Sequence, residues 1–226
     1  MKTFFAATLA ASALAFNGPE IVSDANGYAQ LNIKEDGKDK TVYIASPSWF
    51  TGGGGDTLSL PEGGRVYLSN TPELSSEGFY KPALLGGAVE YDVDMSQMEC
   101  GCIAAFYLVR MPAHDWSGNL DKTDGFWYCD ANQVDGEYCP EFDIMEANKY
   151  AFQTTAHPCS TPYNGHYDSN CEHGGLTGGS LSGGERRRLS VGKFFLMEML
   201  KMIASTFTYM ILNLSINLFQ KKHWSW

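Results

Sequence analysis

Apolar and polar positions alternate in short runs between residues 16 and 99, and glycine and proline separate these runs. This rhythm is typical of short antiparallel strands that bury one face. Residues 103–111 (IAAFYLVRM) form an apolar run with large side chains, which favours a central strand over an edge strand. The pattern therefore predicts an all-β sandwich. Its clearest short runs are TVYIAS at 41–46, GGRVYLS at 63–69 and AVEYDVDM at 88–95.

Residues 115–136 are polar and rich in glycine and aspartate, so they predict a long loop. The loop carries Trp116, Trp127 and Tyr128. Exposed rings of this kind can stack on sugars, and ordinary packing beneath the loop is the equal alternative.

The composition changes after residue 175. Residues 176–193 are rich in glycine, serine and arginine and predict a linker, and residues 194–226 predict an apolar helical tail. From Leu181 onward there are seven Lys/Arg and two Asp/Glu, a charge of +5, against nine and 24 before it, a charge of −15. We therefore expect this part either to pack poorly against the body or to be foreign to its fold. Polar residues within the tail argue against membrane association.

The first fifteen residues, MKTFFAATLAASALA, carry an early lysine and an apolar run too short to span a bilayer. They predict a signal peptide over residues 1–15 and a secreted, extracellular protein. Thiols that enter an oxidising compartment usually pair, so we expect all six cysteines to form disulfides. Their spacing lacks the pairs typical of zinc sites, so no metal and no cofactor are expected.

The net charge of −10 disfavours a nucleic-acid or anionic-membrane partner and favours a neutral or polymeric substrate, so no nucleic-acid partner is expected. The chain is expected to act as a monomer.

Residues 139–159 (CPEFDIMEANKYAFQTTAHPC) place three acids as E-x-D-x-x-E in a segment suited to a strand. Glu141 and Asp143 share one face by alternation, whereas Glu146 has the opposite parity. It joins them only if a β-bulge lies between Asp143 and Glu146. A bulge would let two carboxyl groups approach the ~5–5.5 Å that retaining glycoside hydrolysis requires. A solvated strand edge or calcium ligation are the alternatives.

The segments EFDIMEAN and AHPC resemble the E-x-D-I-W-E-A-N and H-P-C signatures of glycoside hydrolase family 7, the cellobiohydrolases and endoglucanases. The strands GGRVYL and LLGGAVEYDVDMSQMECG and the loop WYCDANQ are similar too, so the resemblance covers roughly residues 64–159. Met145 departs from the family's tryptophan. The resemblance implies a concanavalin-like β-jelly-roll over residues 16–175, apparently incomplete, that needs no metal.

By this resemblance the chain would cleave β-1,4-glucosidic bonds in cellulose or a related β-glucan. Glu141 would be the nucleophile, Glu146 the general acid/base and Asp143 the residue that positions Glu141. The resemblance also implies a set of substrate-binding residues, namely Tyr107, Asp130, Gln133 and His157. A non-catalytic carbohydrate-binding or effector protein on the same scaffold is the alternative function.

Residues 181–192 (LSGGERRRLSVG) resemble the signature loop of ATP-binding-cassette transporters. The chain has no G-x-x-x-x-G-K-S/T phosphate loop, so no nucleotide chemistry is expected from it.

Overall fold

A computed structural model describes residues 29–45, 52–60, 64–73, 75–82, 88–122, 126–134, 136–174, 176–182, 186–191 and 213–219. The predicted signal peptide lies outside these ranges. The described elements are fourteen strands: β1 (Gln30–Glu35), β2 (Lys38–Ala45), β3 (Gly52–Gly54), β4 (Thr57–Ser59), β5 (Arg65–Ser69), β6 (Val89–Asp94), β7 (Ile103–Val109), β8 (Cys129–Asp130), β9 (Glu137–Tyr138), β10 (Glu141–Ala147), β11 (Ala151–His157), β12 (Leu176–Ser182), β13 (Arg186–Val191) and β14 (Asn213–Phe219).

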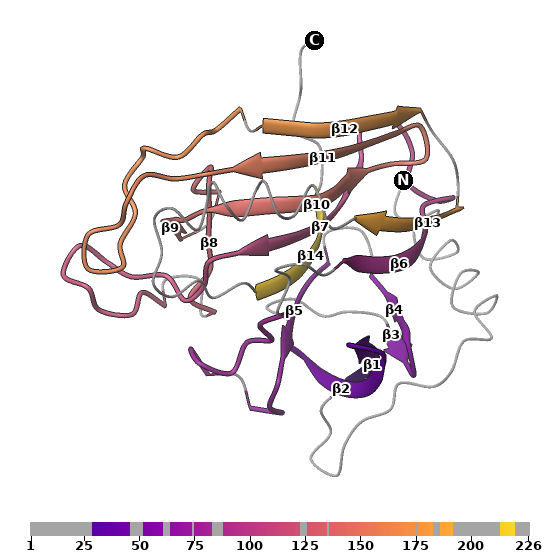
Figure 1. Ribbon diagram of the computed structural model, residues 1–226, viewed down its shortest axis with the longest axis horizontal. Coiled ribbons are helices and arrows are strands. Elements are labelled where there is room, and N and C mark those ends of the chain that lie inside the picture. The colour runs from indigo at the N-terminus through magenta and orange to yellow at the C-terminus, as the bar shows by residue number, and fades with distance from the viewer. Residues whose placement is uncertain are drawn as a thin grey trace, which may run out of the picture.

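The main sheet has eight strands in the order β1-β2-β5-β14-β7-β10-β11-β12, and every neighbouring pair is antiparallel. Strand β7 pairs with β14 on one side and β10 on the other (Figure 1). The prediction of a central strand at residues 103–111 is confirmed.

A second, smaller layer covers one face of this sheet. Strand β6 pairs with β13, and its odd-numbered residues turn inward because its sequence alternates apolar and acidic positions. Tyr91 meets Phe106 edge to face with ring centroids 4.9 Å apart. The core between the layers includes Phe106, Leu108, Phe142 and Phe152. The prediction of an all-β sandwich is therefore confirmed.

The opposite face of the main sheet carries a second cluster, which contains Tyr67, Tyr107, Tyr128 and the Cys129–Cys139 disulfide. Strands β8 and β9, which pair in parallel, lie in the chain segment that leads into β10. Aromatic and disulfide packing thus builds the floor on which the polar residues of β10 sit.

The predictions for the C-terminal part are wrong wherever the structure describes it. Residues 176–182 and 186–191, predicted as a linker, form β12 and β13, which extend the main sheet and pair with β6. Residues 213–219, predicted as helix, form β14 and pair with both β5 and β7. The physical reason is that β5 and β7 would otherwise present unpaired backbone edges. Residues 194–212 and 220–226 of the predicted tail lie outside the described ranges. Among the residues that the structure describes, no helix is long and apolar enough to span a bilayer.

The expectation that all six cysteines pair is also wrong. Disulfides join Cys129 to Cys139 and Cys159 to Cys171, whereas Cys100 and Cys102 are free. The free pair belongs to the turn before β7, in which the Cys102 amide donates to the Glu99 carbonyl at 3.1 Å. The four other cysteines lie between β8 and the segment after β11 and pair with one another, so none of them is left for Cys100 or Cys102.

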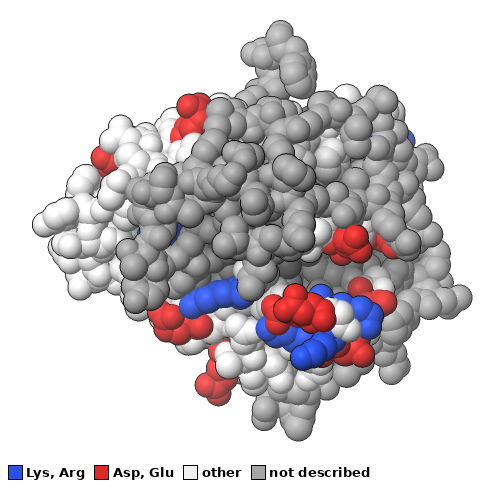
Figure 2. Space-filling view, in the orientation of Figure 1, with Lys and Arg blue, Asp and Glu red and all other residues white. Residues whose placement is uncertain are grey.

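Charged residues intermingle on the described surface. On the β1–β2 hairpin Lys34 pairs with Asp39 at 2.5 Å and Lys40 with Glu35 at 2.8 Å. Figure 2 shows Lys and Arg beside Asp and Glu on the described part of the visible face.

Candidate active site

The three acids of β10 lie on one face because the strand contains the expected bulge. Pairing with β11 shifts register between Asp143 and Glu146, and pairing with β7 shifts between Asp143 and Met145. Glu141, Asp143 and Glu146 therefore stand opposite Val109, Tyr107 and Ala105 on β7, which are all odd-numbered residues of one face. The bulge prediction is confirmed.

The remaining residues of β10 confirm this division of faces. Phe142, Met145 and Ala147 pair with even-numbered residues of β7 and belong to the core beneath β6. The extra residue at the bulge thus lets β10 present three acids on one face while its apolar residues pack into the core on the other face.

Glu141 receives a hydrogen bond from the backbone amide of Ala131 at 3.1 Å. Burial, together with the negative charges of Asp143 and Asp130, raises its pKa well above the ordinary value. The Ala131 amide opposes this rise by stabilising the ionised form. The proton occupancy of Glu141 therefore depends on the charge of its neighbours.

Asp143 is buried and forms a hydrogen bond with His157, whose Nε2 lies 3.0 Å from Asp143 Oδ2. His157 Nδ1 lies 2.7 Å from the carbonyl oxygen of Glu172, and a carbonyl only accepts, so Nδ1 carries a proton. Burial lowers the pKa of His157, but the hydrogen bond and charge of Asp143 outweigh it and raise the pKa overall. Burial raises the pKa of Asp143 in spite of His157.

Glu146 accepts a hydrogen bond from Thr155 Oγ1 at 3.1 Å, and Gln153 Nε2 donates to the same Thr155 oxygen at 2.8 Å. Burial first, and the charge of Asp143 second, raise the pKa of Glu146. A raised pKa favours the protonated carboxyl, which is the form that acts as a general acid.

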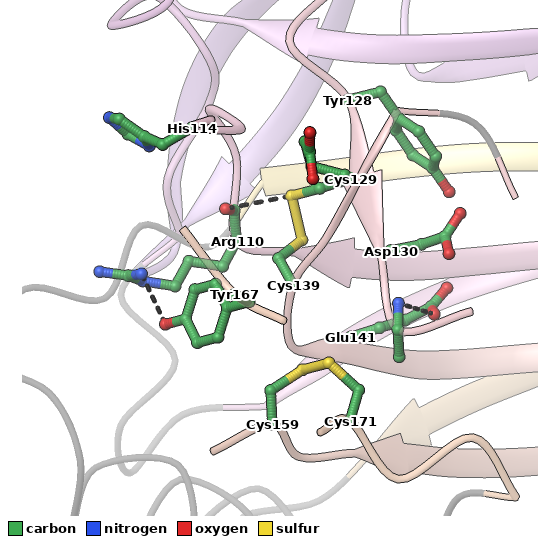
Figure 3. The surroundings of a disulfide bond; sticks show 12 residues. Arg110, His114, Tyr128, Cys129, Asp130, Cys139, Glu141, Cys159, Tyr167 and Cys171 are labelled. Carbon is green, nitrogen blue, oxygen red and sulfur yellow. Dashed lines mark hydrogen bonds between the residues drawn. A yellow bond between two sulfur atoms is a disulfide. The ribbon is translucent and has the colours of Figure 1, made fainter. Parts of the chain in front are cut away.

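Asp130 organises the loop that reaches Glu141. Its Oδ1 accepts from the amides of Asn132 at 2.8 Å and Val134 at 3.1 Å. Asp130 follows Cys129, and Glu141 lies two residues after Cys139, so the disulfide holds both acids at its two ends (Figure 3). Burial raises the pKa of Asp130.

Tyr107 lies on the floor of the site and shares a hydrogen bond of 3.1 Å with the Tyr128 hydroxyl. Arg65 lies over the Tyr128 ring at 4.4 Å, and its charge lowers the pKa of Asp130. Sequence reasoning assigned no role to Arg65. The signal available was an arginine at the first position of a buried strand.

The structure brings five of the seven predicted site residues into one hydrogen-bonded or electrostatically coupled group, and it places Tyr107 beside that group. Gln133 differs, because it is exposed, with a φ of 51°, in the turn that Asp130 caps. The coupled five are Asp130, Glu141, Asp143, Glu146 and His157.

Glu141, Asp143 and His157 each offer a possible metal-ligand atom, and these atoms lie within 4.8 Å of one another. The His157–Asp143 hydrogen bond already uses two of these groups. The three could hold a cation only by breaking that bond.

No family model matches the chain. It is 33% identical over 157 residues to the endo-beta-1,4-glucanase celB of Aspergillus oryzae, which covers 62% of this chain and 35% of the relative. It is 29% identical over 150 residues to the endoglucanase type C of Fusarium oxysporum, with 58% and 34% covered. The chain thus spans about a third of the length of the curated relatives it matches.

Solved structures share the fold. The native endocellulase EGI of Humicola insolens aligns with a TM-score of 0.56 at 14% identity over 86% of this chain and 85% of the other. A GH7 family cellobiohydrolase from Daphnia pulex aligns with a TM-score of 0.53 at 15% identity, covering 90% and 86%. These matches support the β-jelly-roll prediction. They give no support to a transporter signature loop at residues 181–192, part of which forms β13.

Proposed function

The chain is related to the endoglucanases and cellobiohydrolases of glycoside hydrolase family 7 over part of their length, and from this we propose that it is a secreted retaining hydrolase of β-1,4-glucan. The observation that carries the proposal is the bulge in β10, which turns Glu141, Asp143 and Glu146 to one face. One of the solved relatives is an endoglucanase I complexed with cellobiose, which supports this class of substrate.

Glu141 would attack the anomeric carbon while the carboxyl of Glu146 donates its proton to the departing glycosidic oxygen. A water molecule would then lose a proton to Glu146 and attack the same carbon, releasing the sugar from Glu141 with its configuration retained. Each carboxyl group thus returns to its starting state.

The nucleophile must be ionised although its pKa is raised, and the neighbouring pair resolves this conflict. When a proton lies between Asp143 and His157, Asp143 no longer repels the charge on Glu141. The Ala131 amide then holds Glu141 as a carboxylate. Asp143 would position Glu141 in this way.

The substrate-binding residues implied by the resemblance divide by exposure. Tyr107 and Asp130 are buried, so they would support the carboxylates from behind, and exposed Gln133 would be free to reach a sugar hydroxyl. His157 would act through Asp143.

A non-catalytic carbohydrate-binding protein is the second candidate, because the chain spans about a third of its curated relatives. Reducing-sugar release from amorphous cellulose, with proton NMR of the first product anomer, separates the two functions. We expect β-configured product, and Glu141→Gln should lower the rate at least ~10³-fold while retaining cellulose binding.

Glu99→Gln is the matched control, because Glu99 is an exposed acid bound to Lys149 and Tyr150 outside the site. It should leave the rate unchanged. If the unmutated chain binds cellulose and releases no sugar, the hydrolase proposal fails and the binding function replaces it.

A further inference from the structure

Two neighbouring turns outside the carboxylate site expose large aromatic rings. Trp116 is 65% exposed in the turn Asp115–Asn119, and Tyr163 is 67% exposed in the turn Tyr163–His166. We call these the Trp116 turn and the Tyr163 turn. They touch, since a Cβ added to Gly118 would lie 3.0 Å from the Asn164 Cβ.

Both turns are held by dense local hydrogen bonds. Asp115 Oδ1 accepts from the amides of Ser117 at 2.8 Å and Asn119 at 2.9 Å. Tyr163 and His166 exchange two backbone hydrogen bonds of 2.9 Å across Asn164 and Gly165, whose φ angles are 51° and 85°. The turns present their rings from a fixed backbone, which lowers the entropy lost when a ligand binds.

A buried histidine supports one side of the indole. The ring centroids of Trp116 and His166 lie 4.2 Å apart, and His166 is 4% exposed. Its Nδ1 contacts the His114 carbonyl at 2.9 Å and Glu137 Oε2 at 3.6 Å. Among the described residues, none forms a hydrogen bond with its buried Nε2 atom. This arrangement fixes the ring while most of its surface remains open to solvent.

The chemistry around the rings selects a neutral, hydroxyl-rich ligand. The turns carry Ser117, Asn119 and Asn164, which can bond to hydroxyl groups, beside flat rings suited to the apolar face of a pyranose. The nearby acids Asp115 and Glu137 disfavour phosphate or nucleic acid. A β-glucan chain, the substrate class of the proposed function, combines both requirements.

The surface is separate from the carboxylates. Figure 3 shows His114, whose carbonyl holds His166, on the opposite side of the Cys129–Cys139 disulfide from Glu141. We propose that Trp116 and Tyr163 form a secondary binding surface for β-glucan, which holds the polymer outside the site where it is cleaved. This rests on the glucan class of the proposed function and does not require that the chain be catalytic.

The test measures binding of the full chain to soluble mixed-linkage β-glucan by affinity electrophoresis and to amorphous cellulose by depletion. Trp116→Ala should weaken both about tenfold, and Tyr163→Ala should weaken them less. Trp116→Tyr should restore part of the binding. Cleavage of a short soluble oligosaccharide should not change.

Tyr150→Ala is the matched control, because Tyr150 is a 53% exposed aromatic in the turn between β10 and β11. It should bind polymer as the unmutated chain does. Unchanged polymer binding by Trp116→Ala, or an equal loss of binding in Tyr150→Ala, would refute the proposed binding surface. Conversion of a dimer to a monomer by Trp116→Ala would also overturn it, since the patch would then be a self-association interface.

The two proposals fail in distinguishable ways. If the unmutated chain releases no sugar but Trp116→Ala weakens polymer binding, the binding surface is supported and the hydrolase function is refuted. If the unmutated chain cleaves polymer and Trp116→Ala binds polymer equally well, the hydrolase function is supported and the binding surface is refuted.

Discussion

Replacing Glu141 with glutamine should stabilise the fold at alkaline pH while it abolishes hydrolysis. Burial and the charges of Asp143 and Asp130 raise the pKa of Glu141 well above its ordinary value. Between that value and the raised pKa the folded chain binds more protons than the unfolded chain. The free energy of unfolding therefore falls as pH rises through this window.

Glutamine removes the charge and keeps an oxygen that can accept from the Ala131 amide. Its amide N–H groups can also donate to the neighbouring carboxylates. Relief of one poorly solvated charge should raise the free energy of unfolding by about 2 kcal/mol at pH 8. For a domain of this size, that corresponds to roughly 4–8 °C in melting temperature.

The assay is thermal unfolding followed by circular dichroism between pH 4 and pH 8. At pH 4 Glu141 is mostly protonated in both folded and unfolded chains, so variant and parent should differ little. The difference should grow with pH. A difference that stays constant across this range would refute the assignment of a raised pKa to Glu141.

Glu99→Gln supplies a control of opposite sign. Hydrogen bonds from Lys149 and Tyr150 lower the pKa of Glu99, so its contribution to stability exists above pH 4.5 and is lost on acidification. This variant should be less stable than its parent at pH 8 and equal to it well below the lowered pKa.

Three further outcomes follow from single contacts. Thr155→Val removes the hydroxyl that donates to Glu146, so the pKa of Glu146 should rise and the alkaline limb of the pH–rate profile should move to higher pH. Gln153→Ala should shift this limb less, because Gln153 contacts Thr155 and not Glu146. A shift of the limb to lower pH in Thr155→Val would contradict the contact. Phe142→Ala should lower the free energy of unfolding by about 3–5 kcal/mol in urea titrations, because Phe142 is buried in the core beneath β6. A loss under about 1 kcal/mol would mean that this core does not form. Titration with a thiol reagent should give two reactive thiols per chain, and Cys100 should react before Cys102 because Cys100 is more exposed. Fewer than one reactive thiol per chain would show that Cys100 and Cys102 are oxidised.

The sequence was sufficient to predict the β-bulge in β10, because the parity of three acids constrained it locally. Three acids at i, i+2 and i+5 cannot share a strand face without an extra residue, so the bulge followed from parity. The His157–Asp143 contact needed the register of two strands, which spacing does not give. Arg65 was missed because its burial depends on Tyr128, 63 residues away in the chain.

The C-terminal part was misread because composition was weighed above periodicity. The segment NLSINLF at 213–219 alternates polar and apolar residues with a period of two, which is the signal of a strand. Strand β12 contains two glycines, which are depleted in strands, and both β12 and β13 contain few of the β-branched and aromatic residues that favour them. Pairing with existing strand edges overrode that local preference, and no window of the sequence contains such information.

The place of β14 has a consequence for the order in which the chain folds. Strand β5 ends at Ser69 and β7 begins at Ile103, yet the strand between them begins only at Asn213. The centre of the sheet therefore cannot close until Asn213–Phe219 has been synthesised. Closure over such long sequence separations is slow, and until then β5 and β7 remain open edges. A chaperone that shields extended segments during synthesis should increase the yield of this protein more than it would for a sheet built from neighbouring hairpins.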